Sequence, residues 1–392
     1  MSSDPIITSL LDTDYYKLTM QQGIFHHYPT AVVDARFHCR TPVDLTPLSD
    51  EVREQIRHLA DLRLDGREQR WLEVSGVFQA DYLDWLAEQR LDPEKVDVQI
   101  SPKGLQINVR GSWLEVTLFE VYILAIVSEL YGRHLQAGAC LALARENLDA
   151  KLNWLDAHFD ADEEFHFVDF GTRRRFSSEW HQKLLETLVK RESTHLMGTS
   201  NIMLAQRLGL QPVGTMGHEW LQAHQALVDD LASSQRKALE VWYQEYQGKL
   251  GIALTDTISM SAFLRDFDRE LALCYSGLRH DSGDPVEWGE QALKHFELLD
   301  IDPANQVLVF SDGLNFTKAL DIHRHFRGRI ATSFGIGTWL TNDVGGCPLN
   351  MVLKLVSCNG QPVAKISDAP GKTMCLDKGY VENLKRVYSL AS

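Results

Sequence analysis

The chain has 392 residues, of which 44% are apolar and 24% charged, a balance typical of globular proteins and not of disordered chains. Acidic residues outnumber basic ones by 54 to 39, and the resulting net charge of −15 argues against a nucleic-acid or anionic-membrane partner. Because single cores rarely grow beyond about 250–300 residues, the length predicts two domains.

Cysteine usage and the termini indicate a reducing compartment. The six cysteines show neither a C-x-x-C pair nor the spacing of a disulfide framework, so we expect free thiols. The first residues lack the pattern of a signal peptide, and the longest apolar run, 121–127, is too short to cross a membrane. We therefore expect a cytoplasmic protein.

The first part of the chain mixes short strands with amphipathic helices, as in an α+β domain. Apolar periodicity predicts strands at 32–37, 96–100 and 105–109 and helices at 49–63 and 81–88. The apolar stretch 113–131 predicts a buried helix that leads into the rest of the chain.

From about residue 165 the pattern becomes regular, with a short apolar strand, a polar or glycine-rich turn and a helix in each unit. Strands are predicted at 165–170, 212–215, 252–254, 271–275, 306–310 and 329–332. Repeated units of this kind predict parallel strands with helical crossovers, in either an α/β barrel or a doubly wound sheet.

The positions of polar residues separate these two folds. Clusters of chemically capable residues follow the strands: 169–173, 215–218, Asp256, 279–281, 311–313 and 335–338. In a barrel all such loops meet at one end, whereas in an open sheet only those beside the strand-order switch converge. The clusters therefore favour an irregular parallel α/β barrel.

We predict an N-terminal α+β domain over 1–130 and a barrel over 131–344. The last segment, 345–392, is predicted to return to the N-terminal domain, with strands at 351–356 and 363–366. It carries no further cluster of polar residues.

Two local patterns each have two interpretations. Gly335-x-Gly337 lacks the third glycine of a dinucleotide-binding loop, and is either a phosphate cradle or a plain turn. Arg173-Arg174-Arg175 is either a cation cluster for a small anionic substrate or a solvated face. His218-Glu219 lacks the second histidine of a zinc-protease helix, because Gln222 stands in its place, so this pair is not expected to bind metal.

Seven segments together resemble the nicotinate phosphoribosyltransferase family over nearly the whole chain. In the family's order they are TDYYKLTM at 13–20, DFGTRRR at 169–175, GTSN at 198–201, GTMGHEW at 214–220, RHDSGDP at 279–285, SDG at 311–313 and FGIGT at 334–338. The resemblance implies a barrel beside an N-terminal α+β domain. It also implies a homodimer in which Tyr16 reaches the neighbouring subunit.

The resemblance further implies an ATP-assisted ligase of NAD synthesis and salvage. The nitrogen of nicotinic acid attacks the anomeric carbon of phosphoribosyl pyrophosphate, and pyrophosphate leaves with the help of Mg²⁺. Nicotinate mononucleotide forms. ATP phosphorylates a histidine, and hydrolysis of the phosphohistidine, which yields ADP and phosphate overall, drives turnover.

His218 is the histidine that the resemblance identifies as the phosphoryl acceptor. His218 lies near the start of a predicted helix, where the helix dipole favours an incoming phosphate. A neutral imidazole is a nucleophile when a carboxylate orients its other nitrogen. Either Asp256 or Asp281 would supply that carboxylate. The resemblance counts Arg279 and Asp281 as further catalytic residues.

The resemblance also implies substrate contacts. Phe170 and Tyr16 would sandwich the pyridine ring, and the alternative is that Phe170 is a core residue. Arg173 would bind the anionic groups of the substrate, and Thr215 would bind the base. Asp281 and Asp284 would bind ribose hydroxyls or the shell of a Mg²⁺ ion. The phosphates would be bound by Asp312, Gly313, Gly335, Gly337 and Thr338. Specific metal ligands are not assigned.

Two positions bear on substrate and mechanism. Ser200 stands where the related nicotinamide-using enzyme has an aspartate, and a hydroxyl can donate to a carboxylate that an aspartate would repel, so nicotinic acid is favoured. Gly217 stands where many relatives carry a bulkier residue, which predicts a looser backbone before His218.

Three alternatives remain at this stage. One is a transferase that uses nicotinamide or quinolinate, and another is a catalytically silent barrel that binds a ligand or a protein. The third is a sugar-phosphate aldolase or isomerase, which needs a Schiff-base lysine or an acid/base pair, and the strand-end clusters contain no lysine.

Overall fold

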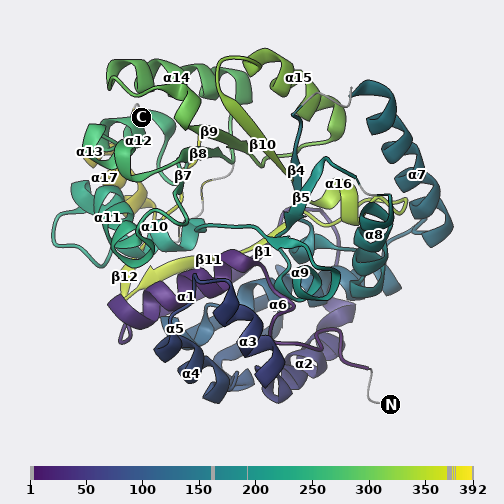
Figure 1. Cartoon of the computed structure of the whole chain (residues 1–392). Coiled ribbons are helices and arrows are strands. Elements are labelled where there is room, and N and C mark those ends of the chain that lie inside the picture. Colours follow the sequence, from purple (N-terminus) through teal and green to yellow (C-terminus); the bar gives the residue numbers. More distant parts are fainter. Residues whose placement is uncertain are drawn as a thin grey trace.

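Two β-sheets organise the molecule (Figure 1), and the computed structural model describes residues 4–159, 164–191, 193–368, 373, 375 and 377–390. Within these residues, a parallel sheet of seven strands has the order β6-β5-β4-β10-β9-β8-β7, and an antiparallel sheet of five has the order β12-β11-β1-β3-β2. The parallel sheet curls as an irregular, open barrel.

The barrel strands are short and alternate with helices that cover their outer face. The strands are β4 (Phe167–Asp169), β5 (Leu196–Thr199), β6 (Gln211–Pro212), β7 (Ile252–Leu254), β8 (Gly277–His280), β9 (Val307–Phe310) and β10 (Ala331–Ile336). The helices are α7 (Leu141–His158), α8 (Ser178–Lys190), α9 (Ile202–Leu208), α10 (His218–His224), α11 (Ser234–Tyr246), α12 (Met260–Asp266), α13 (Arg269–Cys274), α14 (Pro285–Leu298), α15 (Phe316–Phe326) and α16 (Thr338–Thr341).

Aromatic residues hold the strands to the helices. Phe310 and Phe334 on the paired strands β9 and β10 stack with ring centroids 5.7 Å apart, and Phe310 also stacks on Phe326 of α15. All three are fully buried, so this side of the sheet is a packed core and the polar residues are left to the loops.

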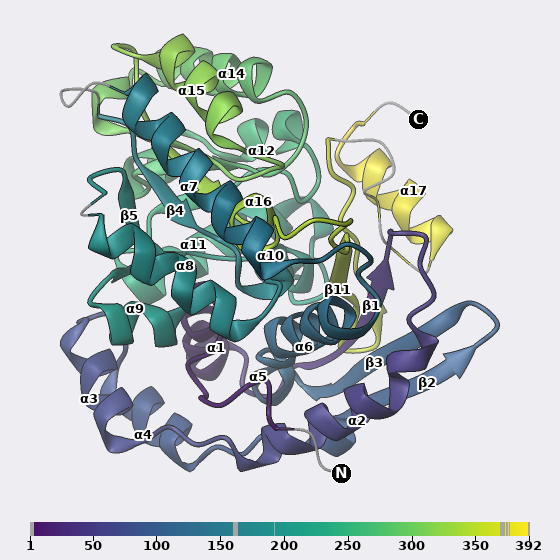
Figure 2. The same cartoon turned by 90° about the vertical axis from the view of Figure 1, so that its right-hand side faces the viewer.

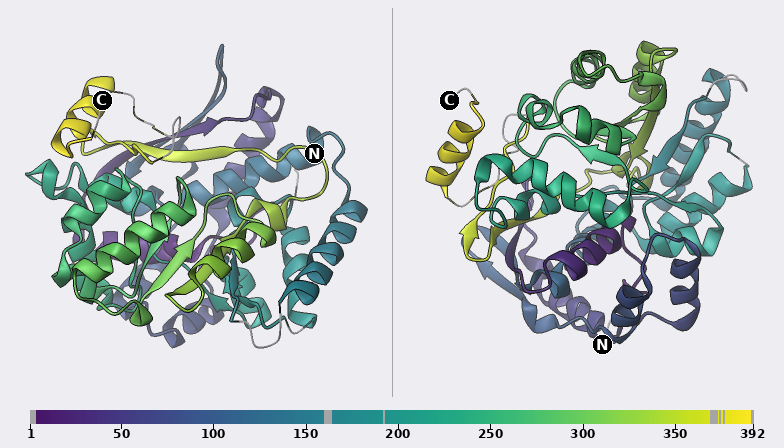
Figure 3. Two further views of the ribbon diagram at one scale, coloured as in Figure 1. Left: turned by 90° about the horizontal axis from the view of Figure 1, so that it is seen from above. Right: turned by 60° about the vertical axis from the view of Figure 1, so that its left-hand side comes forward.

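The antiparallel sheet joins the two ends of the chain. It contains β1 (Val32–Cys39), β2 (Val96–Ser101), β3 (Gly104–Ser112), β11 (Met351–Cys358) and β12 (Gln361–Pro362). β11 pairs with β1 from Cys39 opposite Met351 to Val33 opposite Cys358, so the C-terminal segment returns to the N-terminal part as predicted (Figure 2). Figure 3 shows β11, in yellow, extended beside the helices of the barrel.

Helices of the N-terminal part pack below the barrel. They are α1 (Tyr15–His27), α2 (Ser49–His58), α3 (Gly66–Val74), α4 (Ala80–Glu88), α5 (Trp113–Val116) and α6 (Phe119–His134), while α17 (Lys378–Val387) lies near the C-terminus. Short 3-10 helices span Thr46–Leu48, Leu59–Asp61, Pro93–Lys95, Thr172–Arg174, Leu231–Ser233 and Pro303–Asn305. α6 is buried on nearly all sides, which explains its unbroken apolar sequence.

Two strand predictions are wrong. Residues 271–275 lie mostly in helix α13, where the Asp268 side chain accepts a hydrogen bond from Leu271 N and caps the helix, and the strand starts only at Gly277. Residues 363–366 follow β12, which spans only Gln361–Pro362. The strand β5 was not predicted. The domain boundaries after residues 130 and 344 remain predictions.

Within the described ranges, no helix is both long enough and apolar enough to cross a bilayer.

Candidate active site

A pocket of about 500 Å³ lies where the loops of the barrel meet the antiparallel sheet, and its size is within the roughly 300–1,000 Å³ of ligand sites. The sequence-predicted residues in its lining are Tyr16, Phe170, Arg173, Ser200, His218, Arg279, Asp281, Asp312, Gly313, Gly335, Gly337 and Thr338. Loops from separate barrel strands therefore open on one pocket, as the barrel interpretation requires.

Two predicted residues lie elsewhere. Thr215 lines an adjoining cavity, and its Oγ1 donates a hydrogen bond to the carbonyl of Ile252 at 3.2 Å. The Asp284 carboxylate accepts a hydrogen bond from Glu287 N at 2.8 Å and caps α14. The structure does not bring either side chain into the main pocket.

A buried hydrogen-bond network shapes the loop after β4. The Asp169 carboxylate accepts hydrogen bonds from Gly171 N at 2.9 Å and Thr199 Oγ1 at 2.6 Å, and contacts His181 Nε2 at 2.6 Å. These contacts fix the turn that carries Phe170. Gly335 on β10 lets the Phe170 ring approach, because a Cβ there would lie 2.3 Å from Phe170 Cδ2.

The three consecutive arginines have different environments, and Arg174 and Arg175 are not on a solvated face. Arg175 is fully buried and binds both oxygens of Asp12, at 2.6 and 2.7 Å. Arg174 donates to the carbonyl of Met351 at 2.9 Å, and burial together with Arg173 lowers its pKa to about 9. Arg173 lines the pocket.

Tyr16 lies in the pocket of its own chain, and its ring packs on the loop before His218. A Cβ at Gly217 would lie 2.9 Å from Tyr16 Cε2, so glycine is needed for this approach. Gly217 has φ of −104°, which any residue adopts. Gly217 therefore makes room for the Tyr16 ring, and the expected loosening of the backbone before His218 stays a prediction.

Ser200 has a hydrogen-bond partner already. Its Oγ donates to Asp14 Oδ1 at 2.7 Å, and burial raises the pKa of Asp14 although Ser200 itself opposes the shift. The Ser200 proton is thus directed to Asp14 and not toward the pocket. The argument that this hydroxyl donates to the nicotinate carboxylate needs a rearrangement of this pair.

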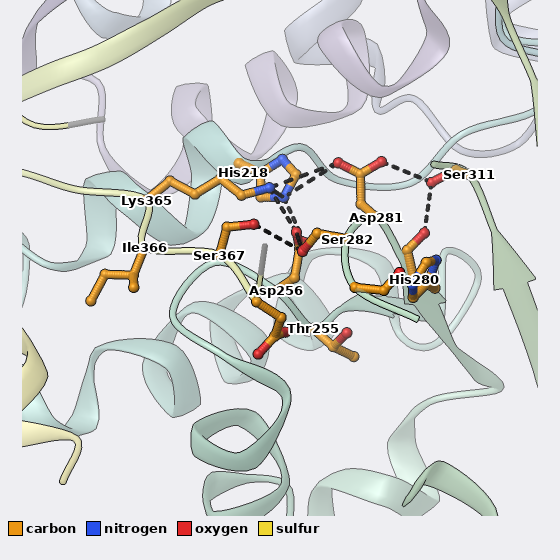
Figure 4. A network of polar contacts seen from close by, with 12 residues as sticks. His218, Thr255, Asp256, His280, Asp281, Ser282, Ser311, Lys365, Ile366 and Ser367 are labelled. Atoms are coloured by element: carbon orange, nitrogen blue, oxygen red, sulfur yellow. Dashed lines mark hydrogen bonds and ion pairs between the residues drawn. The ribbon is translucent and has the colours of Figure 1, made fainter. Parts of the chain in front are cut away.

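His218 lies in a polar network that joins three barrel loops to the C-terminal segment (Figure 4). His218 Nε2 is 2.7 Å from Asp256 Oδ1 and 3.7 Å from Asp281 Oδ2, so Asp256 is the carboxylate placed to orient the imidazole. Lys365 Nζ lies 2.6 Å from the same nitrogen and 2.7 Å from Asp256 Oδ2. Ser282 Oγ donates to Asp256 Oδ2 at 2.6 Å.

The charges of this network act on one another. Burial lowers the pKa of His218, Lys365 lowers it further and Asp256 opposes both, so the imidazole is neutral near pH 7. Burial opposes ionisation of Asp256, but His218 and Lys365 outweigh burial and hold the pKa of this carboxyl well below its usual range.

Three pocket cations were missed from the sequence. Arg40 follows β1, Lys354 lies on β11, and Lys365 comes from the segment that was predicted to carry no polar cluster. Burial, together with Lys365 and Arg40, lowers the pKa of Lys354 to about 7. A lysine inside the otherwise apolar strand Met351–Cys358 was the available signal. The statement that the site lacks a lysine holds for the barrel loops only.

The donor set also resembles a metal site. His218, Asp256 and Asp281 offer ligand atoms within 4.8 Å of one another. The oxygen donors suit Mg²⁺, but the Lys365 ammonium already lies against His218 and Asp256. Asp281, which is partly exposed to the pocket, is therefore the better candidate to share a cation with a bound phosphate.

Comparisons with known proteins cover nearly the whole chain. Residues 11–128 match the nicotinate phosphoribosyltransferase N-terminal domain, and residues 165–392 match the nicotinate phosphoribosyltransferase family. The curated nicotinate phosphoribosyltransferase of Escherichia coli O157:H7 (strain EC4115 / EHEC) is 51% identical over 394 residues, which cover 99% of this chain and 97% of the relative. That of Shigella sonnei (strain Ss046) is 52% identical at the same coverage.

Solved structures give the same result. The nicotinate phosphoribosyltransferase of Vibrio cholerae superposes with a TM-score of 0.96 at 40% identity, covering 100% of this chain and 96% of that one. A putative nicotinate phosphoribosyltransferase of Saccharomyces cerevisiae superposes with a TM-score of 0.91 at 29% identity over the full length of both chains. The chain belongs to the nicotinate phosphoribosyltransferase family.

Proposed function

We propose that this protein transfers the phosphoribosyl group of phosphoribosyl pyrophosphate to nicotinic acid, giving nicotinate mononucleotide and pyrophosphate in NAD synthesis and salvage. Membership of the family supports the reaction. The observation that carries it to this chain is that Phe170, Arg279 and His218 line one pocket, which supplies a ring surface, a guanidinium and an imidazole to the same cavity.

The base binds between Phe170 and Tyr16, which both line the pocket. Stacking of this kind contributes roughly 0.5–1.5 kcal/mol beyond burial. Arg279 Nε is buried and has no hydrogen-bond partner among the described residues, so it is ready to donate to an anionic substrate. Arg173 adds a second guanidinium on the same wall.

The phosphates bind toward the antiparallel sheet. Arg40, Lys354 and Lys365 bring positive charge to that side of a chain whose net charge is −15. The negative charge of a bound phosphate group would raise the pKa of Lys354 from about 7 and so stabilise its ammonium form. Gly313, with φ of 60°, and the loop from Gly335 to Thr338 also line the pocket, and their backbone N–H groups would donate to the phosphates.

ATP assists the reaction through His218. The neutral imidazole accepts the γ-phosphoryl group, Asp256 orients the ring, and Lys365 balances the charge of the added phosphate. ADP leaves, and hydrolysis of the phosphohistidine regenerates the imidazole. Mg²⁺, held by Asp281 together with substrate oxygens, would supply charge neutralisation for the leaving pyrophosphate.

The compartment and the assembly complete the proposal. The structure describes all six cysteines and shows no disulfide between any two of them, which suits the reducing cytoplasm. A homodimer is what the resemblance predicts, and sedimentation equilibrium tests it. Tyr16 lines the pocket of its own chain, which supports a site within one subunit, and the reach of Tyr16 to a neighbouring subunit stays a prediction.

The rates with three bases test the substrate. With phosphoribosyl pyrophosphate and ATP present, kcat/KM should be highest for nicotinic acid. Nicotinamide should react at least about 100-fold more slowly, because it leaves a charged group of the site unpaired. Quinolinic acid should also react more slowly, because its second carboxylate stands next to the attacking nitrogen. Product formation is followed by chromatography of the mononucleotides. A preference for the amide would overturn the proposed substrate and leave the fold assignment intact.

Replacing the phosphoryl acceptor tests the role of ATP. In His218→Ala, ATP hydrolysis should fall to background, while slow ATP-independent formation of nicotinate mononucleotide persists, because the base and phosphate contacts remain. Wild-type protein incubated with γ-labelled ATP should carry a label that is stable in base and lost in acid. A label that persists in acid, or a His218→Ala protein that still hydrolyses ATP, would refute the phosphohistidine.

A further inference from the structure

A buried lysine connects the base side of the pocket to the helix of His218. Lys17 lies on α1 directly after Tyr16, and its side chain is fully buried. Its ammonium pairs with Glu120 of α6 at 2.5 Å and also with Glu219, the second residue of α10. Burial alone would lower the pKa of Lys17, but Glu120 and Glu219 outweigh burial and raise it, so the lysine is charged.

Both carboxylates are held in place from a second direction. Glu219 Oε1 accepts hydrogen bonds from Trp113 Nε1 at 2.5 Å and from Thr117 Oγ1 at 2.8 Å. Glu120 Oε2 lies 3.5 Å from the hydroxyl of Tyr16, and both Glu120 and Glu219 line the pocket. A cation that is fixed between two anchored carboxylates has little freedom to move alone.

A steric contact runs beside this ionic one. The Tyr16 ring packs on Gly217, the residue before His218, with no room for a Cβ. Lys17 Nζ also lies 5.6 Å from the centroid of the Tyr16 ring. A displacement of Tyr16 by a stacked base therefore reaches the start of α10 through two routes, the Gly217 contact and the Lys17 to Glu219 ion pair.

We propose that Lys17 is a positioning residue that couples occupation of the base site to the His218 imidazole, through its ion pairs with Glu120 and Glu219. This inference rests on the proposed function, since it concerns ATP-assisted turnover. Lys17 contacts neither substrate nor His218. Its effect is to keep phosphohistidine hydrolysis tied to formation of nicotinate mononucleotide, so that without it ATP is hydrolysed whether or not base is bound.

The test is the amount of ADP formed per nicotinate mononucleotide in Lys17→Met and Glu219→Gln. Glu219→Gln keeps a side-chain oxygen for Trp113 and Thr117, and it replaces the charged oxygen facing Lys17 by an amide nitrogen that cannot accept a hydrogen bond. In both variants the ratio should rise about fivefold or more over wild type, the lower end of usual coupling between two sites. The double variant should show no further rise over Lys17→Met, because Lys17→Met already breaks the ion pair that Glu219→Gln removes.

Glu245→Gln is the matched control, because it tests whether loosening α1 at any point raises the ADP to product ratio. The Glu245 carboxylate is buried and holds the other end of the same helix, through His26 Nδ1 at 2.8 Å and His27 Nε2 at 3.1 Å. This variant should lower the melting temperature and leave the ADP to product ratio at the wild-type value.

The outcomes separate this inference from the proposed function. If wild-type protein forms no nicotinate mononucleotide, the proposed function fails. If wild-type protein is active and folded Lys17→Met and Glu219→Gln both keep the wild-type ratio, only the coupling role is refuted. If Lys17→Met does not fold because two carboxylates lose their partner, the ADP to product ratio of Glu219→Gln alone decides whether the coupling role holds. An equal rise in Glu245→Gln would also refute the specific role of Lys17.

Discussion

At the scale of single residues, Lys365 sets the electrostatics of His218. Its ammonium lies 2.6 Å from the imidazole and disfavours the protonated ring, so it lowers the pKa of His218 in addition to burial. Loss of this charge should raise that pKa. In Lys365→Met a larger fraction of His218 is then protonated at mildly acidic pH, and the protonated ring is no nucleophile.

The predicted result is a shift of the pH profile of ATP hydrolysis. The acid limb of Lys365→Met, followed from about pH 5 to 8, should move to higher pH than in wild type. Asp256→Asn provides the opposite case, because Asp256 raises the pKa of His218, and its acid limb should move to lower pH. A limb that stays in place in both variants would show that another group controls the acid side.

At the scale of elements, local pattern was enough where a strand has its own apolar sequence. Ile252–Leu254 forms β7 as predicted, and the predicted strands at 32–37, 96–100 and 105–109 lie in β1, β2 and β3. Residues 271–275 were wrongly predicted as a strand because their apolar side chains suit a strand and a short helix equally well. The Asp268 cap and the burial of Leu271 and Ala272, with Leu273 exposed, select the helix.

The strand β5 shows a further limit of local pattern. Leu196–Thr199 includes Met197 and Gly198, which have no strong strand propensity. Pairing with β4 on one side and β6 on the other makes it a strand, and a Cβ at Gly198 would lie 2.2 Å from the Gln211 carbonyl oxygen. Neighbours that are distant in sequence therefore decide this element.

At the scale of the whole molecule, the site could be predicted only as far as the barrel loops reach. Phe170, His218 and Arg279 could be predicted because they lie at or after the ends of barrel strands and within the family motifs. Arg40 and Lys354 come from the antiparallel sheet, where pairing of β1 with β11 joins positions more than 300 residues apart, such as Cys39 and Met351. No local pattern reveals that contact, and thus the cations of the phosphate side were missed.

Within one chain, the same topology brings Tyr16 of the N-terminal part and His218 of the barrel to one pocket. We therefore predict a site built within one chain, whereas the family resemblance predicts that Tyr16 reaches the neighbouring subunit. If Tyr16 instead served a neighbouring subunit, a mixture of Tyr16→Ala and His218→Ala proteins would contain one intact site per mixed dimer. Within one chain, each variant has a defective site whatever its partner.

Subunit mixing therefore distinguishes these arrangements. Tyr16→Ala and His218→Ala should each lose ATP-assisted formation of nicotinate mononucleotide, and their mixture, unfolded together and refolded, should regain none of it. Wild-type protein taken through the same refolding provides the control for recovered activity. Recovery in the mixture of about one quarter of wild-type activity, the share expected when half of the dimers are mixed and each has one intact site of two, would instead establish a shared site. The absence of recovery is expected because the Tyr16 ring is packed on Gly217 of its own chain, one residue from the imidazole that it serves.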